Sequence, residues 1–269
     1  MASLSLSDIR PTTRRRISQI AIYIVAAVIV LLIVLAADWR TIGHQFFDVS
    51  VMKKLWPRIL VVGLVNTLVY TLISFCVGSV LGTLFALMKL TKGPFRWFAV
   101  AYVELFRGLP ALLTIFIMAF AIPIAFNGVK FPGGGAGAGC LGLVLVTSAY
   151  TAEIIRAGIQ AVPHGQREAA RSLGMSPVTT TMFIILPQGL RIVIPPMTNE
   201  FVMLLKDSAL IYVAGLTPAT KELTSFGRDG LSTYASSTPL ILAAILYLIV
   251  TVPLTWLVGR LEKRLAVRK

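Results

Sequence analysis

Long stretches without a charged side chain constrain this sequence more than any other feature. Residues 17–37 are 21 consecutive uncharged residues, and residues 59–88 contain no charge either. About 20 predominantly apolar residues are enough for a helix to cross the hydrocarbon core of a bilayer. Charged residues make up only 13% of the chain, whereas soluble domains carry about 25%. The sequence therefore predicts an all-α polytopic membrane protein.

About six transmembrane helices are expected. The first follows a polar, basic tail, and its apolar length exceeds the ~7–15 residues of a signal-peptide core, which favours a retained anchor. Further spans are expected at residues 59–88, 97–126, 140–159, within 176–215, and at 239–258. The resulting parts are a cytoplasmic basic tail (1–16), an N-terminal helix with an outer connection (17–58), a membrane core (59–260) and a C-terminal cytoplasmic tail (261–269).

Glycine and proline predict interruptions in two of these spans. Gly108 and Pro110 are expected to break the helix over 97–126, and broken helices at membrane depth usually line a cavity or are buried in protein. Pro187 is expected to end a short helix at Leu186, so that a turn precedes the following span. The small residues of 59–88 predict a helix that packs closely against protein. Residues 216–237 are expected to be a polar outer loop.

The distribution of basic residues predicts the orientation. The formal net charge is +14, but no basic stripe interleaved with aromatic residues appears, which argues against nucleic-acid binding. With both termini inside, 15 of the 25 Lys and Arg residues fall in inner segments, seven in outer segments and three in spans. Lys and Arg concentrate on the cytoplasmic side of membrane proteins. We therefore expect both termini and the loop at 163–177 to be cytoplasmic.

The chain offers no pattern for enzyme chemistry. It contains no HExxH, GxSxG or phosphate-binding GxxxxGK[ST] sequence. Cys76 and Cys140 are expected to be packing residues, and the two histidines are too far apart in the sequence to suggest a metal site. The match of Gly137–Gly142 to the dinucleotide pattern follows no strand and is interpreted as accidental. We expect no catalytic residue, no metal, and no cofactor bound by this chain.

One polar stretch, residues 163–177, interrupts the apolar sequence. Pro163 suits the start of a short helix, and Gly174 suits its end. Glu168 and Arg171 are spaced to pair, and Ala169, Ala170 and Leu173 would form a small apolar face. An ordinary solvated connector between two membrane helices is the alternative reading of the same pattern.

The residues around this stretch carry a resemblance to a known family. Glu168-Ala169-Ala170, three residues, Gly174, nine residues and then Ile184–Pro187 resemble the Glu-Ala-Ala loop of the membrane subunits of bacterial ATP-binding-cassette (ABC) importers. The stretches 104–110, 149–159 and 199–208 resemble the polar amino-acid branch of that family. The resemblance covers roughly residues 60–260.

This resemblance implies a fold, a function and partners. The fold is that of a type I ABC importer transmembrane domain with a cytoplasmic coupling helix, in the bacterial inner membrane. The function is that of a permease subunit, half of an import pore for a polar amino acid. The partners are a cytoplasmic ATPase dimer that binds ATP and Mg²⁺, a second permease subunit (itself or a homologue) and an extracytoplasmic solute-binding protein. The residues implied in coupling to the ATPase are Gln166, Glu168, Ala169, Ala170, Arg171, Leu173 and Gly174.

Ionisable residues within the expected spans are the candidates for the solute pathway, because such residues usually face protein or water. They are Glu104, Arg107, Glu153, Glu200, Lys206 and Asp207. A zwitterionic amino acid needs both signs of charge, and both are present. The alternative is that these charges pair with one another and hold helices together. Leu109, Thr114 and Ala209 depart from the branch pattern and leave the identity of the solute open.

An ion-coupled secondary transporter of a small polar solute is the rival class. Such a protein would also show intramembrane charges and broken helices, commonly with inverted repeats between its two halves. No second half of this chain matches the first.

Overall fold

A computed structural model describes residues 11–266 of the chain, and the side chains of residues 19–264. Throughout the described residues the elements are helices, without a strand, which confirms the all-α prediction. The chain divides into two units, Met1–Asp48 and Val49–Lys269, and each is described by itself. Most of the expected basic tail, and the end of the C-terminal tail, lie outside the described residues.

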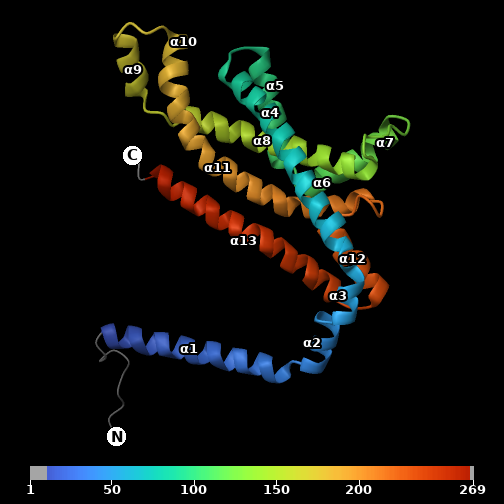
Figure 1. The fold of residues 1–269 in the computed structure, drawn as a ribbon. Helices are drawn as coiled ribbons and strands as arrows, with labels where there is room; N and C mark the ends of the chain where they lie inside the picture. Colours follow the sequence, from blue (N-terminus) through green and yellow to red (C-terminus); the bar gives the residue numbers. More distant parts are fainter. Residues whose placement is uncertain (1–10, 267–269) are drawn as a thin grey trace. The chain divides into compact units, whose positions relative to one another are not determined.

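The first unit contains helices α1 (Pro11–Ala36) and α2 (Trp39–Phe46) (Figure 1). The apolar stretch Gln19–Ala36 is long enough to cross a membrane. Asp38 caps α2 by accepting hydrogen bonds from the hydroxyl of Thr41 at 2.7 Å and from its backbone N–H at 3.0 Å. These bonds lower the pKa of Asp38. The predicted first span is confirmed as a helix of membrane length.

The second unit contains all the remaining elements (Figure 1). Three of them (η2, η3 and η4) are π-helical turns and η5 is a 3₁₀ helix. In chain order the elements are α3 (Val49–Leu55), η2 (Ile59–Leu64), α4 (Val65–Leu90), α5 (Pro94–Gly108), α6 (Ala111–Phe116), η3 (Ile117–Ala121), α7 (Ile122–Ala125), α8 (Gly134–Gln160), α9 (His164–Ser172), α10 (Pro177–Thr180), η4 (Thr181–Ile185), α11 (Leu186–Asp207), η5 (Ser208–Ala214), α12 (Leu223–Tyr234) and α13 (Thr238–Ala266).

The described residues contain five helical stretches long and apolar enough to cross a membrane, or up to six if one bent pair counts as a span. Besides α1, the continuous ones are Ile59–Leu90, Gly134–Gln160, Pro177–Ala214 and Thr238–Arg264. The bent pair is α5 and the segment Ala111–Ala125, which meet at 106°. The sequence prediction of about six spans, one of them broken at Gly108 and Pro110, is confirmed.

Close packing of α4 on α8 forms the centre of the second unit (Figure 1). Every fourth residue of one α4 face is small and buried: Ser74, Gly78, Gly82 and Ala86. A Cβ atom on Gly82 would lie 2.6 Å from the Cβ of Thr151 on α8, far inside van der Waals contact. Small residues let two membrane helices approach this closely, so the close packing predicted for this span is confirmed.

The expectation of a turn after Leu186 was wrong. The chain is helical from Pro177 to Ala214, and Pro187 lies in the first turn of α11. The π turn η4 ends just before this proline. A wider turn relieves the clash between a proline ring and the carbonyl four residues earlier, and a missing N–H costs least where a helix register changes. The proline therefore alters the helix locally without ending it.

The glycine-rich stretch before Cys140 is also helical, so the expected start of the fourth span was too late. Helix α8 begins at Gly134. A Cβ on Gly135 would lie 2.1 Å from the carbonyl oxygen of Ala214, and one on Gly139 would lie 2.7 Å from Cγ2 of Ile211. The glycines thus let the start of α8 lie directly against η5, an approach that larger side chains would block.

The expected outer loop contains a helix, α12, that the sequence reading missed. Glu222 caps it and is fully buried. Its carboxylate accepts hydrogen bonds from the backbone N–H of Thr224 and Ser225 and from the Ser225 and Tyr247 hydroxyls, at 2.6–3.2 Å. Burial raises the pKa of Glu222, and these hydrogen bonds offset part of the shift.

Candidate functional site

The polar stretch of the sequence folds as predicted into a short helix, α9, between α8 and α10 (Figure 1). The helix ends at Ser172, and Gly174 in the turn that follows has a φ of +84°, which favours glycine because a Cβ is strained there. The N–H of Met175 donates to the carbonyl of Ala170 at 3.1 Å, and the guanidinium of Arg171 donates to the Met175 carbonyl at 2.6 Å. These bonds fix the path of the chain as it leaves α9.

Most of the predicted coupling residues form an exposed surface on α9 and its C-terminal turn. The exposed ones are Gln166, Glu168, Ala169, Arg171, Leu173 and Gly174. Leu173 is 84% exposed, although it is a large apolar side chain in a charged segment. Val178 and Phe183, on the elements that follow, are also exposed, at 67% and 70%. The surface therefore offers apolar side chains beside charged ones.

Two details of the predicted surface differ in the structure. Ala170 is only 4% exposed, so it packs against its own chain rather than sharing the open face of Ala169. Within the described residues Glu168 forms no ion pair with Arg171, because that guanidinium binds the Met175 carbonyl instead. The carboxylate of Glu168 is therefore open to a partner.

A second feature is a cavity of about 360 Å³ at the bend between α5 and α6. The bend places Leu109 and Pro110 between two helix axes at 106°. The cavity is lined by Arg107, Gly108, Leu109, Pro110, Ala111, Leu143, Val146, Thr147, Tyr150, Glu200, Met203, Leu204 and Asp207. Its wall is thus built from α5, α6, α8 and α11.

Three of the six predicted pathway residues meet at this cavity. Arg107 comes from α5, and its guanidinium carbon lies 5.7 Å from the ring centroid of Tyr150. Glu200 and Asp207 come from α11, seven residues apart and therefore on one helix face. The wall thus carries one cationic and two acidic side chains.

Two of the other predicted residues, Glu104 and Lys206, lie outside this wall. Both are exposed, on the same helices as the cavity-lining charges. The mutual neutralisation of Glu104 and Arg107, weighed for the sequence, is absent among the ion pairs of the described residues.

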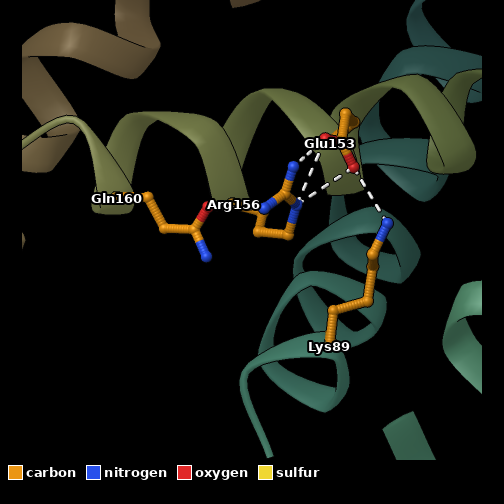
Figure 2. A network of polar contacts seen from close by, with 4 residues as sticks. All are labelled: Lys89, Glu153, Arg156 and Gln160. Carbon is orange, nitrogen blue, oxygen red and sulfur yellow. Dashed lines mark hydrogen bonds and ion pairs between the residues drawn. The ribbon is translucent and has the colours of Figure 1, made fainter. Parts of the chain in front are cut away.

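Glu153 takes part in a separate ion cluster on α8 (Figure 2). Its carboxylate accepts from Nζ of Lys89, at the end of α4, at 2.9 Å. Arg156, one turn later on α8, pairs with the same carboxylate and donates to the side chain of Gln160. This arrangement is the alternative considered for the sequence, in which charges pair and hold helices together.

The sequence reading did not single out the α8 side of the cavity. Thr147 and Tyr150 line it, and Thr147 Oγ1 is buried without a hydrogen-bond partner among the described residues. A signal was present, because Thr147 and Tyr150 are three residues apart and so share a helix face. Neither residue carries a charge, so neither stood out among the apolar neighbours.

Comparison with known proteins identifies the family. The family model described as "Binding-protein-dependent transport system inner membrane component" matches residues 78–267. The probable glutamine ABC transporter permease protein GlnM of Bacillus subtilis (strain 168) is 41% identical over 206 residues, which are 76% of this chain and 91% of the relative. The arginine transport system permease protein ArtQ of the same strain is 34% identical over 76% of this chain and 90% of its own.

A solved structure agrees with these relatives. It is described as the crystal structure of an amino acid ABC transporter with histidines, and it superposes with a TM-score of 0.73 at 34% sequence identity. The match covers 82% of this chain and 100% of that one.

The chain has helices of membrane length, a cavity at a broken span and an exposed charged helix between two spans. Together these features define a membrane transport protein. The chain belongs to the family of inner-membrane components of binding-protein-dependent transport systems. It is therefore a permease subunit of an ATP-driven importer and a multi-pass membrane protein, and the secondary-transporter alternative is not favoured.

Proposed function

We propose that this permease subunit forms half of an import pore for a polar amino acid and is driven through α9 by a separate ATPase. The functions named for its relatives, glutamine transport for GlnM and arginine transport for ArtQ, support an amino acid as the solute. The observation that carries the proposal is the cavity at the α5–α6 bend, whose wall includes Arg107 of α5 and two acidic residues of α11.

The charges of the cavity suit the two ends of an amino acid. A guanidinium binds a carboxylate through charge-assisted hydrogen bonds, so Arg107 would hold the solute carboxylate. Glu200 or Asp207 would hold the ammonium group, and the buried Thr147 Oγ1, which has no partner among the described residues, would gain a hydrogen bond where solute entry opens this part of the wall. Glu104 and Lys206, next to the wall on the same helices, are candidates for the approach to the cavity.

The exposed surface of α9 supports a coupling role. Glu168 would be its polar contact with the ATPase, and Leu173 would insert into an apolar hollow of that partner, because a leucine that is 84% exposed gains by burial. Gln166, Ala169 and Arg171 would form the rest of the surface that contacts the ATPase, and Gly174 sets the turn after α9. Ala170 contributes from inside, by packing α9 against its own chain.

The assembly follows from the same proposal. Two permease subunits, a dimer of ATPases that bind ATP and Mg²⁺, and an outer solute-binding protein would make up the importer. Both termini and α9 would lie in the cytoplasm, as the excess of Lys and Arg in those segments indicates.

Uptake by proteoliposomes tests this function. The complete complex is reconstituted with ATP inside and binding protein outside, and individual radiolabelled amino acids are supplied. We expect ATP-dependent uptake of one or a few of them, lowered roughly tenfold by Arg107→Gln, which removes the charged half of a carboxylate contact. Arg191→Gln, an exposed arginine of α11 outside the cavity wall, is the matched control. Full uptake by Arg107→Gln would place the solute elsewhere.

A further inference from the structure

Lys89, Glu153 and Arg156 form an ion cluster (Figure 2). It lies outside the cavity wall and, along the chain, close to α9. Lys89 joins the last turn of α4 to Glu153 on α8, with 2.9 Å between Nζ and Oε2. Arg156 extends the cluster along α8 to Gln160, the last residue of that helix. Helix α9 begins four residues further on, at His164. The cluster thus occupies the end of α8 that any movement of α9 must reach first.

The two cations of the cluster differ in the helices that their ion pairs with Glu153 join. Arg156 and Glu153 are three residues apart on one helix, so their pair stays within α8. Lys89 comes from α4, so its pair with Glu153 crosses between helices. The Lys89 side chain is only 9% exposed and that of Glu153 is 22% exposed. A pair so shielded from water is weakly screened and holds its geometry better than a surface pair.

The same region ties α5 to these helices. Ala86 of α4, Val103 of α5 and Ala152 of α8 are each fully buried and pack together. The hydroxyl of Tyr102 on α5 lies 2.7 Å from that of Ser148 on α8. Helices α4, α5 and α8 therefore form one packed block. Arg107 and Tyr150, which line the cavity, both belong to it.

We propose that the Lys89–Glu153 ion pair is a positioning contact for energy coupling. It holds the end of α8 against α4, so that a movement of α9 shifts the α4–α5–α8 block and its part of the cavity wall as one body. Without this pair, the end of α8 would bend away from α4 and the movement would be lost before it reached the cavity. The importer would then hydrolyse ATP without moving solute. The inference rests on the proposed role of α9.

Removing one cation of the cluster at a time provides the test. Lys89→Met breaks the contact between helices but leaves Glu153 neutralised by Arg156. Arg156→Gln removes the other cation but leaves the contact between helices intact. Both variants are reconstituted as the complete complex, and the ATP hydrolysed per molecule of amino acid taken up is measured. We expect Lys89→Met to raise this ratio by about tenfold, and Arg156→Gln and Lys89→Arg to leave it near the wild-type value.

The outcomes separate coupling from simple charge neutralisation. If Lys89→Met and Arg156→Gln change the ratio equally, or if neither changes it, the inference is wrong. Should Lys89→Met lower the yield of folded complex, the double variant Lys89→Met/Glu153→Gln removes both charges and carries the same prediction. Glu168→Lys is measured in parallel, because normal transport by that variant overturns the proposed role of α9, whatever Lys89→Met does.

Discussion

Thr147 lies in the wall of the cavity with a buried hydroxyl oxygen that has no hydrogen-bond partner among the described residues. Leaving such a group unsatisfied costs about 1–3 kcal/mol, a cost that a solute passing the cavity would offset. Thr147→Val keeps the shape and removes the hydroxyl. We expect it to leave the melting temperature unchanged or raised, and to raise the KM for uptake several-fold by removing a hydrogen bond worth about 1 kcal/mol.

Thr180 provides the control for this prediction. It too is buried with an unpartnered hydroxyl oxygen, but it lies on α10, away from the cavity wall. Thr180→Val should match Thr147→Val in its effect on stability and leave the KM unchanged. Equal KM values for the two variants would show that the Thr147 hydroxyl does not contact the solute.

Glu222 predicts a dependence of stability on pH. Burial raises its pKa in the folded protein above the value of about 4.3 in the unfolded chain. The stability contributed by this group is therefore complete below pH ~4.3 and is lost as the pH rises through the raised folded value. The variant Glu222→Gln cannot titrate there. We expect the melting temperature of the wild type, minus that of Glu222→Gln, to fall as the pH rises above about 4.3.

Thermal unfolding of both proteins in detergent at a series of pH values measures this difference in melting temperature. A difference that rises with pH would mean that the four hydrogen bonds to the carboxylate outweigh its burial, and that the pKa of Glu222 is lowered. Asp38, whose pKa is lowered by Thr41, titrates in both proteins and so cancels from the comparison.

At the scale of elements, the packing of α4 on α8 predicts a sharp sensitivity to size. A Cβ on Gly82 would lie 2.6 Å from Thr151 Cβ and 2.7 Å from the Ser148 carbonyl oxygen, and a backbone atom cannot rotate away. Gly82→Ala should therefore destabilise the protein by about 1–3 kcal/mol, the usual cost of overpacking. Gly259→Ala on α13, where a Cβ meets nothing within 4 Å, should be neutral. Melting temperatures in detergent compare the two variants.

The elements that the sequence predicted correctly are those set by local chemistry. Long apolar runs gave the spans, and Gly108 with Pro110 gave the break between α5 and α6, because no tertiary contact is needed to read either signal. The helix end predicted at Pro187 was wrong, because whether a proline ends a helix depends on how the preceding turn accommodates it. The start of α8 was missed because the role of its glycines is contact with η5, which is distant in sequence.

The candidate site, like the fold, was predicted only where local chemistry determines it. The charged residues of α9 and of the cavity were found from residue type and spacing alone. The sequence could not tell which intramembrane charges meet. Glu153 and Glu200 look alike as carboxylates within apolar spans, yet one pairs with Lys89 and the other lines the cavity. Nor could it show that Ala170 faces inward while Ala169 is exposed, because that depends on how α9 docks on its own chain.

For the whole molecule, transport driven through α9 requires a mechanical connection from α9 to the cavity. Helix α9 leads directly from α8, and α8 carries both the ion pair with Lys89 and the cavity residues Thr147 and Tyr150. The cavity is lined by residues of this chain, whereas Glu168 on α9 and Leu173 in the turn after it are exposed. We therefore infer that a partner covers this surface in the working complex and moves it during each cycle of hydrolysis.

ATP hydrolysis by the reconstituted complex shows whether a partner ATPase acts on this chain through α9. Wild type, Glu168→Lys and the control Glu262→Lys, an exposed glutamate near the end of α13, are assayed with binding protein loaded with individual amino acids. We expect one loaded amino acid to stimulate hydrolysis in the wild type and in Glu262→Lys, and we expect Glu168→Lys to abolish the stimulation while remaining folded. Full stimulation of Glu168→Lys, or failure of the wild-type chain to associate with any ATPase, would contradict this expectation.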